Sequence, residues 1–477
     1  MKLSSLLKGV KTQDVYEERE VERVTDKDNE NLKNALFVCI DGIRCDGHSL
    51  AEKVIKRGAV AVVTNRDLGI REQIMVEDTR CALSQIASNF YGNPTAKLKI
   101  IGVTGTNGKT STCFFIKSIL EGLGKKCGLI GTIENTWGEK KKNSVLTTPE
   151  PMELQKLFND MVKSGCEYCV MEVSSQALSQ KRVHGIHFCA SALTNITPEH
   201  LDYHINMENY INAKLELLSQ SDFACVNIDD EIIKENIYKS ECETFTYSFT
   251  DDWADYTAKN VVCNENGIRY EFVGMDCISR IESKLFGRFT VYNTLCAVSV
   301  LINLGFDIDE ISKAVRNVET VKGRAEIVPI NTKFNVMIDY AHTPDGLRNI
   351  LSCVREITKG KVILVFGCGG DRDKGKRAEM GRIAGEMSDV AVVTSDNPRS
   401  ENPLLIINDI LCGMERSRAR IAVIENRRQA IEFALGKARK DDLVLLAGKG
   451  HELYQIIGNE KIPFDEREII REYFMDN

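Results

Sequence analysis

The residues from 105 to 112 have the types and the order that bind phosphate. They follow an apolar run, 98–104, that is typical of a buried strand, and they lead into a stretch, 109–123, with apolar residues at helical spacing. A glycine-rich turn at a helix N-terminus presents backbone N–H groups to an anion. At the start of that helix, Lys109 and Thr110 have the side chains that bind the outer phosphates and Mg²⁺.

The turn departs from the usual spacing of a phosphate loop. That spacing requires a glycine five residues before Gly108, and Val103 stands there. A glycine turn that happens to precede a lysine is the plainer alternative. Because the turn joins a strand to a helix, we favour a phosphate site made by consecutive residues, namely Gly105, Thr106, Asn107, Gly108, Lys109, Thr110 and Ser111.

Length and composition exclude several classes of protein. The chain has 477 residues, enough for about three domains, with 43% hydrophobic and 27% charged residues, so it is not collagen-like, disordered or a coiled coil. A net charge of −7 argues against a general nucleic-acid-binding protein. No apolar stretch approaches the ~20 residues that cross a bilayer. Since Lys8 also interrupts the place where a signal peptide needs its apolar core, we expect a cytoplasmic protein that binds neither nucleic acid nor membranes.

The 16 cysteines are scattered, and many lie inside apolar runs, as Cys39 and Cys225 do. Cys166 and Cys169 form a C-x-x-C pair, but no second pair stands at zinc spacing. We therefore expect reduced cysteines that pack as small hydrophobic residues.

Strand-like runs alternate with helical stretches along most of the chain, which predicts parallel sheets covered on both faces. We expect an α/β fold with a smaller N-terminal α/β domain, a central P-loop-type and mostly parallel sheet, and a C-terminal Rossmann-like domain. The turn at 92–95 suggests the first boundary, so the predicted domains are 1–96, 97–327 and 328–477. The predicted strands include 35–40, 59–63, 98–104, 129–130, 168–173, 190–194, 223–226, 336–339, 362–366, 390–394, 421–424 and 443–446.

Further segments occur in the order of one known family. They are Thr-Thr-Pro-Glu at 147–150, Met-Glu-Val-Ser-Ser-Gln at 171–176, Thr-Asn at 194–195, His-Leu-Asp-Tyr-His at 200–204, Ala-Lys at 213–214, Asp-Tyr-Ala-His-Thr-Pro-Asp at 339–345, Gly-Cys-Gly-Gly-Asp-Arg-Asp-Lys-Gly at 367–375, Asp-Asn-Pro-Arg at 396–399 and Gly-Lys-Gly-His-Glu at 448–452. With the loop at 105–111, they resemble the Mur ligases, which build the peptidoglycan stem peptide. The resemblance covers nearly the whole chain and is nearest to the members that add diaminopimelate.

The resemblance implies an ATP-dependent amide ligase that adds meso-diaminopimelate to UDP-N-acetylmuramoyl-L-alanyl-D-glutamate through an acyl phosphate. ATP and Mg²⁺ are the implied cofactors, the two substrates are the implied partners, and we expect a monomer. The first domain would bind the UDP end, the second ATP and the metals, and the third the amino acid. Asn293 resembles the family's adenine contact, and Arg324 and Asp339 resemble its phosphate and ribose contacts.

The implied catalytic residues are Lys109, Glu172, His200 and Lys214, and the implied metal ligands are Thr110 with the last three of these. Glu172 fits because a carboxylate at the end of a buried strand needs a cation partner. A lone histidine ordinarily packs, so the role of His200 depends on the resemblance. The lysine that matches Lys214 is carbamylated in the family, and an unmodified lysine would repel Mg²⁺ by ~4 kcal/mol at ~4 Å. We hypothesise that Lys214 is modified.

The resemblance also assigns the two organic substrates. The UDP-substrate contacts are His48, Thr147, Thr148, Ser174, Gln180 and Arg182, and the amino-acid contacts are Arg372, Asp396, Asn397, Pro398, Arg399, Gly448 and Glu452. Three positions depart from the family pattern. Asp-Lys-Asp at 26–28 replaces the usual Asp-Ser-Arg on the uridine side, Leu146 replaces an Asn, and Lys322 replaces a Pro.

The pair Arg372 and Arg399 decides the predicted amino acid. Meso-diaminopimelate and lysine differ by one distal carboxylate, which two arginines can hold in forked geometry. A simple turn explains Asp-Asn-Pro at 396–398 but not the two arginines. The alternatives are L-lysine, a modified acceptor as in a folylpolyglutamate synthetase-like relative, and a non-catalytic nucleotide-binding protein.

Overall fold

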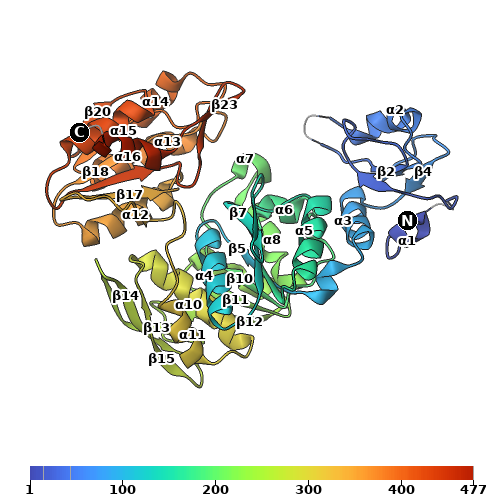
Figure 1. Ribbon diagram of the computed structural model, residues 1–477, viewed down its shortest axis with the longest axis horizontal. Coiled ribbons are helices and arrows are strands. Elements are labelled where there is room, and N and C mark those ends of the chain that lie inside the picture. The colour runs from blue at the N-terminus through green and yellow to red at the C-terminus, as the bar shows by residue number, and fades with distance from the viewer. Residues whose placement is uncertain (14–15, 43–44, 476–477) are drawn as a thin grey trace.

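The computed structural model describes residues 1–13, 16–42 and 45–475, which form three α/β domains in a row (Figure 1). The N-terminal domain, drawn in blue, lies at one end, and the C-terminal domain, drawn in orange and red, lies at the other. The sheets have the kinds predicted from the sequence, including a mostly parallel central sheet, so the predicted fold class is confirmed.

The N-terminal domain contains a four-stranded parallel sheet in the order β1-β2-β3-β4. Neighbouring residues of β2 face opposite sides, because Leu36 packs with α1 and α3 whereas Phe37 packs with α2. Its elements are α1 (Leu3–Leu6), β1 (Arg23–Thr25), β2 (Ala35–Val38), the 3₁₀ turn η1 (Gly47–Leu50), α2 (Ala51–Lys56), β3 (Ala61–Thr64), β4 (Gln73–Met75) and α3 (Thr79–Phe90), followed by the 3₁₀ turn η2 (Pro94–Lys97).

The central domain contains an eleven-stranded sheet in the order β15-β14-β13-β12-β11-β10-β5-β9-β6-β7-β8. Its strands are β5 (Lys99–Thr104), β6 (Cys127–Ile130), β7 (Glu134–Trp137), β8 (Lys140–Asn143), β9 (Tyr168–Glu172), β10 (Ala190–Leu193), β11 (Phe223–Asn227), β12 (Glu243–Ser248), β13 (Tyr256–Asn264), β14 (Gly267–Val273) and β15 (Ile278–Ser283). Its helices are α4 (Lys109–Gly122), α5 (Pro151–Lys163), α6 (Ser175–Ser179), α7 (Leu201–His204), α8 (Met207–Leu215), α9 (Glu231–Asn236), α10 (Arg288–Asn303) and α11 (Ile308–Val315).

Helices cover both faces of this sheet. On β5, Ile101 packs with α4, α10 and α11, whereas Ile100 packs with α5 on the opposite face. The helix predicted for 109–123 is α4, and Phe115 and Ile119 from its apolar stripe are buried in the first of these cores. The phosphate loop therefore leaves a strand that is buried on both sides.

Antiparallel hairpins extend both edges of the central sheet. Strands β13, β14 and β15 form one extension, and β6, β7 and β8 form the other. The sequence analysis did not predict the strands between 243 and 283. Only alternate residues of β14 are deeply buried in its second half, so this region lacks the continuous apolar runs that marked the parallel strands.

The C-terminal domain contains a six-stranded sheet in the order β16-β17-β21-β18-β19-β20, parallel except for β16. Its sheet begins at Glu326, two residues before the predicted boundary at 328. The strands are β16 (Glu326–Ile327), β17 (Asn335–Asp339), β18 (Val362–Phe366), β19 (Val390–Val393), β20 (Arg420–Val423) and β21 (Leu443–Ala447), with a separate hairpin of β22 (Tyr454–Ile457) and β23 (Glu460–Pro463). The helices are α12 (Pro344–Ile357), α13 (Gly375–Met387), α14 (Pro403–Cys412), α15 (Arg427–Lys437) and α16 (Glu466–Met475).

The topology gathers the predicted site residues at two sheet edges. In the central domain β10, β5 and β9 are parallel neighbours, so the residues that follow them lie at one edge. In the C-terminal domain the residues that follow β17, β21, β18 and β19 lie together for the same reason. Polar contacts between the two domains, described below, bring these edges into contact.

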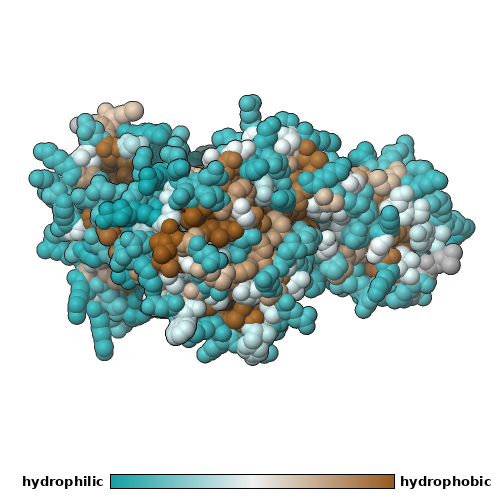
Figure 2. All heavy atoms as spheres, turned by 90° about the horizontal axis from the view of Figure 1, so that it is seen from below, coloured by the Kyte–Doolittle hydropathy of each residue, from teal (hydrophilic) through white to brown (hydrophobic). Residues whose placement is uncertain are grey.

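The surface differs between the middle and the two ends of the molecule. Seen from below, hydrophobic residues gather over the central domain, and the two outer domains are mostly hydrophilic on this face (Figure 2). Among the described residues, no helix has both the length and the apolar content that crossing a bilayer requires. All sixteen cysteines are free thiols, as expected from their scattered positions.

Candidate active site

The phosphate loop contains two glycines that the structure requires. Gly105 has a φ of 146° and Gly108 a φ of 85°, which side chains rarely allow. A Cβ on Gly105 would lie 1.9 Å from Oγ1 of Thr194, and a Cβ on Gly108 would lie 2.8 Å from Oδ1 of Asn293. The loop therefore requires glycine at positions 105 and 108. It does not require the glycine that the usual phosphate-loop spacing places at position 103.

The Lys109 ammonium folds back over this loop. It donates hydrogen bonds of 2.8 Å to the carbonyl oxygens of Gly105 and Thr106. Burial lowers the pKa of Lys109, while the nearby carboxylates of Glu199 and Glu172 oppose that shift. A cation held only by two carbonyls can exchange them for phosphate oxygens at little cost.

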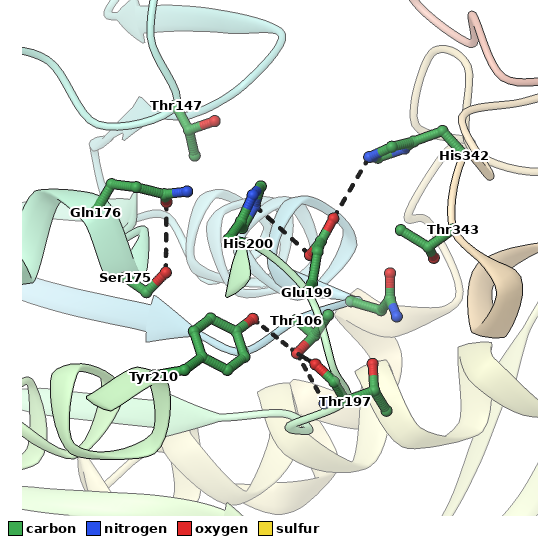
Figure 3. A network of polar contacts seen from close by, with 12 residues as sticks. Thr106, Thr147, Ser175, Gln176, Thr197, Glu199, His200, Tyr210, His342 and Thr343 are labelled. Carbon is green, nitrogen blue, oxygen red and sulfur yellow. Dashed lines mark hydrogen bonds and ion pairs between the residues drawn. The ribbon is translucent and has the colours of Figure 1, made fainter. Parts of the chain in front are cut away.

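Side chains from three segments hold the loop in place. The N–H of Asn107 donates to Oδ1 of Asn195 at 2.7 Å, and Oγ1 of Thr106 lies 3.0 Å from the hydroxyl of Tyr210 (Figure 3). Nδ2 of Asn107 also donates to Oδ2 of Asp345 at 2.9 Å. Because Asp345 belongs to α12, the loop lies at the contact between the central and C-terminal domains.

Glu172 ends β9 with its side chain among hydroxyl and amide donors. The residue is 1% exposed, and its carboxylate accepts hydrogen bonds of 2.9 Å from Oγ1 of Thr110 and of 2.7 Å from the N–H of Thr132. Among the residues that the structure describes, no lysine or arginine forms an ion pair with this carboxylate. A buried carboxylate beside a hydroxyl provides oxygen ligands that suit Mg²⁺.

His200 lies next to Glu199, which also approaches His342. Its Nε2 is 3.7 Å from one carboxylate oxygen of Glu199, and the other oxygen of Glu199 is 3.6 Å from Nε2 of His342 in the C-terminal domain (Figure 3). Burial lowers the pKa of His200 against the opposing charge of Glu199. This favours the neutral imidazole, which is the form that can bind a metal ion.

Lys214 is buried, although a lysine on a helix is ordinarily exposed. It is 2% exposed, and its Nζ lies 4.5 Å from the ring centroid of Tyr210. Burial, together with the positive charge of Lys109, lowers the pKa of Lys214 well below its ordinary value. This environment favours the unprotonated amine, which is the nucleophilic form of a lysine.

A small cavity of about 30 Å³ lies beside the start of α4. Its lining includes Ser111, Phe289, Asn293 and Arg324. The Arg324 guanidinium donates to Oγ1 of Thr110 at 3.1 Å, stacks 4.7 Å over the ring of Tyr340, and keeps its buried Nε without a partner among the described residues. The structure thus brings two predicted nucleotide contacts, Asn293 and Arg324, to one cavity.

Asp339, the predicted ribose contact, bends the chain at the end of β17. Its Oδ1 accepts from the N–H of Ala341 at 2.8 Å and its Oδ2 from the N–H of Ala325 at 2.7 Å. Burial raises the pKa of Asp339, and the charge of Arg324 opposes the shift. Each oxygen keeps a further lone pair that a ribose hydroxyl can use.

The predicted acceptor contacts of the central domain form one network. Oγ1 of Thr148 accepts from the N–H of Ser174 at 3.0 Å, and the Thr148 carbonyl accepts from Arg182 at 2.8 Å. The Arg182 guanidinium also donates to Oε1 of Gln180 at 2.6 Å. Thr147 lies 3.0 Å from the hydroxyl of Thr132, which itself donates to Glu172, so the network reaches the carboxylate site.

His48, the predicted contact of the N-terminal domain, is buried. Its Nδ1 lies 2.7 Å from Oδ1 of Asp46 and 3.2 Å from Oδ1 of Asp41. Its Nε2 has no hydrogen-bond partner among the described residues. An unpaired buried nitrogen is the atom that a polar group of a ligand would satisfy.

The Asp-Asn-Pro-Arg segment at 396–399 follows β19 and contacts the end of β21. Nδ2 of Asn397 donates to Oε2 of Glu452 at 2.9 Å, and Lys449 donates to both of these residues. A Cβ on Gly448, which has a φ of 113°, would lie 2.7 Å from Oδ2 of Asp396. These predicted amino-acid contacts therefore share one surface.

The two arginines of the predicted pocket flank Gly369. A Cβ on that glycine would lie 2.9 Å from Nη1 of Arg399 and 3.9 Å from Cγ of Arg372. The Arg399 guanidinium donates to the carbonyl of Gly370 at 2.6 Å. Pro398, which precedes Arg399, places its carbonyl against Gly370, so the two arginine-bearing loops touch.

Several residues of the site were not predicted. Glu199 joins His200 to His342, and Tyr210 contacts the loop at Thr106 (Figure 3). Asn195 also contacts the loop, and Lys214 lies over the ring of Tyr210. Pro198-Glu199 before His200 is typical of an ordinary turn. A single sequence does not show that Tyr210, on a helix, is buried. Asn195 and His342 lie in the recognised segments at 194–195 and 339–345 without an assigned role, and Glu199 is adjacent to His200.

Family models match both of the larger domains. The Mur ligase middle domain matches residues 103–301, and the Mur ligase, glutamate ligase domain matches residues 323–450. This chain belongs to the Mur ligase family. The resemblance inferred from the motifs is thereby confirmed.

Two similar proteins match this Mur ligase over nearly its full length. A protein of Caldanaerobacter subterraneus subsp. tengcongensis, named UDP-N-acetylmuramoyl-L-alanyl-D-glutamate–2,6-diaminopimelate ligase, is 45% identical over 483 residues that span 100% of both chains. A protein of Clostridium acetobutylicum with the same name, numbered 1, is also 45% identical, over 93% of this chain and 92% of its own.

Solved structures agree with this family. One of a UDP-N-acetylmuramoyl-L-alanyl-D-glutamate–2,6-diaminopimelate ligase is 30% identical, with a TM-score of 0.67 over 93% of this chain and 92% of that one. The folylpolyglutamate synthase of Mycobacterium tuberculosis is 17% identical, with a TM-score of 0.62 over 77% of this chain and 92% of its own. The latter likeness shows a shared fold alone.

Proposed function

We propose that this Mur ligase adds meso-diaminopimelate to UDP-N-acetylmuramoyl-L-alanyl-D-glutamate at the expense of ATP, in the synthesis of peptidoglycan precursors. The observation that carries the proposal is the 45% identity, over the full length, with a relative of that name. The geometry supports it, since a phosphate loop and a pocket with two arginines lie at facing edges of two domains. One chain supplies all of these groups, so we propose a monomer.

The reaction consists of two substitutions. An oxygen of the acceptor carboxylate attacks the γ-phosphorus of ATP, so that a C–O–P bond forms and ADP leaves. The amine of the amino acid then attacks the acyl carbon, an amide bond forms, the amine loses a proton and inorganic phosphate leaves. The first step brings two anions together, and two unit charges repel by ~4 kcal/mol at ~4 Å and an effective dielectric constant of 20. Lys109, aimed at the loop, reduces this repulsion.

We assign the nucleotide to the loop and the cavity beside it. The backbone N–H groups of residues 105–111 and the ammonium of Lys109 would hold the phosphates, and Asn293 would contact the adenine. Arg324 would contact a phosphate through its unpaired Nε, and Asp339 would accept from the ribose. Arg324 and Asp339 offer an unpaired nitrogen and free lone pairs, whereas Lys109 would exchange its two carbonyl partners for phosphate oxygens.

The residues around Glu172 fit Mg²⁺ ions. The hydroxyl of Thr110 and the carboxylate of Glu172 would hold one ion, and His200 and a modified Lys214 a second. Bound magnesium supplies positive charge that neutralises the phosphate oxygens. Two hydroxyls, those of Thr110 and Thr132, donate to the Glu172 carboxylate and so orient its oxygen atoms.

We propose that Lys214 is carbamylated. Its unprotonated amine can attack the carbon of CO₂, which forms an N–C bond and releases a proton, and the product is a carbamate anion. An ammonium at 2% exposure beside Lys109 is unfavourable, whereas an anion there is attracted to Lys109. The modification would thus turn a misplaced cation into a metal ligand.

The acceptor would lie between the N-terminal and central domains. His48 would face the uridine through its unpaired Nε2, and Thr147, Thr148 and Ser174 would donate hydroxyl protons to the diphosphate and the peptide. Gln180 and Arg182, already joined to each other, would bind anionic groups of the acceptor.

The C-terminal domain would hold the amino acid. Arg372 and Arg399 would bind the distal carboxylate, and the group at 396–398 with Gly448 and Glu452 would bind the amino-acid head and orient the amine. L-Lysine would leave the arginines unpaired, at a cost of about 2–5 kcal/mol. That corresponds to a discrimination of roughly thirty- to several-thousand-fold.

The test is product formation. Purified chain is incubated with ATP, Mg²⁺, the UDP-linked dipeptide and either meso-diaminopimelate or L-lysine, and ADP release and product mass are measured. We expect ADP only when both the acceptor and meso-diaminopimelate are present. Equal turnover of the two amino acids, or ADP release that needs a folate-type acceptor, would overturn the proposed substrates.

A further inference from the structure

Two neighbouring loops of the C-terminal domain carry the arginines of the proposed pocket. Residues 367–374 follow β18 and contain Arg372, and residues 394–402 follow β19 and contain Arg399. The two strands are parallel neighbours, so both loops leave the same edge of the sheet. The distance between the arginines therefore depends on what holds one loop against the other.

The backbones of these loops are in close contact and partly strained. The N–H of Gly370 donates to the carbonyl of Asn397 at 2.9 Å, and a Cβ on Gly370 would lie 1.9 Å from the carbonyl oxygen of Pro398. Asp371 has a φ of 52° and Arg399 a φ of 51°, values that non-glycine residues adopt only when their surroundings impose them. One of the two strained residues, Arg399, is an arginine of the pocket, and the other, Asp371, directly precedes Arg372.

A buried ion pair imposes this arrangement. Arg377, on α13, is 1% exposed, and its Nη1 and Nη2 donate to the two carboxylate oxygens of Glu401 at 3.0 and 2.9 Å. Oε1 of Glu401 also accepts from the N–H of Asp371 at 2.6 Å. One carboxylate thus ties α13, the residue before Arg372 and the second loop together.

Two further contacts also hold the loops and α13 together. The hydroxyl of Ser400 donates to Oδ1 of Asp371 at 2.6 Å, and Nη1 of Arg377 donates to Oδ2 of Asp409 at 2.9 Å. The hydrogen bond from Arg377 lowers the pKa of Glu401 to about 2, so the pair stays charged at any working pH. A pair that only stabilised helix packing would have no need to contact the N–H of Asp371.

We propose that the Arg377–Glu401 pair is a positioning clamp that sets the spacing of Arg372 and Arg399, and so determines how well the pocket selects an amino acid with a distal carboxylate. Neither member of the pair is among the proposed contacts of the amino acid, although Glu401 lines the same pocket as Arg399. The identity of the selected amino acid rests on the proposed function, whereas the clamp rests only on the contacts between the two loops.

The first experiment is a comparison of substrate constants in Glu401→Gln. The change keeps the shape of the side chain and removes its charge. We expect KM for meso-diaminopimelate to rise by about 10- to 100-fold, because small displacements of binding groups have effects of that size. We expect KM for ATP, KM for the acceptor and the weak turnover of L-lysine to change by less than about threefold.

A matched control lies on the same helix. Arg382 and Glu386 form an exposed ion pair on α13, with N–O distances of 3.0 and 2.8 Å. Glu386→Gln makes the same chemical change away from the loops, and all constants are expected to stay at their wild-type values. Should Glu401→Gln fold poorly, Ser400→Ala removes the hydroxyl contact with Asp371 but keeps the one from its backbone N–H, and it is expected to raise KM for meso-diaminopimelate less, but selectively.

A second measurement does not depend on the substrate. Hydrogen–deuterium exchange of the full chain is followed in residues 367–374 and 394–402, and we expect faster exchange in Glu401→Gln but not in Glu386→Gln. Unchanged exchange and an unchanged KM for meso-diaminopimelate in both Glu401→Gln and Ser400→Ala would overturn the clamp. If the wild-type chain fails to turn over meso-diaminopimelate, the proposed function fails, while the exchange result still decides the clamp.

Discussion

Replacement of Lys109 by Met tests the central electrostatic argument. The ammonium of Lys109 lies 2.8 Å from two carbonyl oxygens of the phosphate loop and is half-buried, so solvent screens it less than a surface charge. One unit charge at ~4 Å from a developing negative charge contributes about 4 kcal/mol at an effective dielectric constant of 20. At 1.4 kcal/mol per factor of ten, we expect kcat/KM to fall by roughly 10³-fold.

The same change should affect stability little. Lys109→Met removes two hydrogen bonds, each contributing about 1 kcal/mol, but it also removes the cost of burying a cation. We therefore expect the melting temperature to stay within a few degrees of the wild type. A matched control is Lys117→Met on the same helix, where Nζ forms a pair of 2.7 Å with Glu121 at the surface, and activity should not change.

The assay is acceptor- and amino-acid-dependent ADP release, with the ligated product identified by mass. If Lys109→Met kept more than about a tenth of the wild-type rate with its fold intact, a cation at the loop would not be what permits phosphorylation of the carboxylate. Equal losses in Lys109→Met and Lys117→Met would point instead to damage to α4. Either result would refute the reasoning.

Three other outcomes are expected. With ¹³C-labelled bicarbonate, the wild type should show a carbamate signal that Lys214→Ala lacks, and bicarbonate removal should reduce activity by about tenfold or more, reversibly. Arg399→Lys should reduce the preference for meso-diaminopimelate over L-lysine by about thirtyfold, as measured by the ratio of kcat/KM values, because the forked contact is lost. Burial and the charge of Arg324 lower the pKa of His451 from 6.5 to about 3, so the unfolded chain binds more protons between those values and stability falls as the pH decreases through them, by up to ~1.4 kcal/mol per pH unit. Thermal melts between pH 5 and 6.5 should therefore be flatter for His451→Gln, while the exposed His187→Gln serves as the control.

The sequence predicted the parts of this fold that local pattern determines. The strand predicted at 362–366 has those bounds in the structure, and the helix predicted at 109–123 ends one residue earlier, at Gly122. Buried parallel strands are continuous apolar runs, and glycines at a strand–helix turn have a fixed role, so both leave a signal in a single chain. The edge strands β13, β14 and β15 were missed because much of their length is alternately buried and exposed, so they lack the continuous apolar runs by which the parallel strands were found.

The candidate site was predictable only where a side chain carries its own signature. The glycines of the loop and Lys109 do so, and the burial of Lys214 does not, because burial depends on Tyr210 and on elements distant in the sequence. The pair of Arg377 and Glu401 is separated by 24 residues and looks like any surface ion pair in the sequence. Residues that position other residues are therefore recognised only from contacts in the structure. Residues that would bind phosphate can be recognised from their spacing in the sequence.

We predict that the C-terminal domain moves when substrates bind, and the structure allows the hinge to be placed. A hinge at the predicted domain boundary, residue 328, would have to break the strand β16, which pairs with β17, and the ion pairs of Glu326 with Arg467. The N–H of Ala325 is likewise bound to Asp339, so the segment from 323 onward moves with the C-terminal domain. Val318, by contrast, is buried in the core of the central domain.

We therefore expect the bend at residues 319–322, where the chain has neither helix nor strand. Closure would preserve Glu326 and its partners, and it would change the contact between Asn107 and Asp345 across the two domains. Solution scattering should show a smaller particle when an ATP analogue and the acceptor are both bound. Hydrogen exchange should change at 319–322 and stay slow in β16. An unchanged scattering profile would remove the case for closure, and loss of protection in β16 would return the hinge to residue 328.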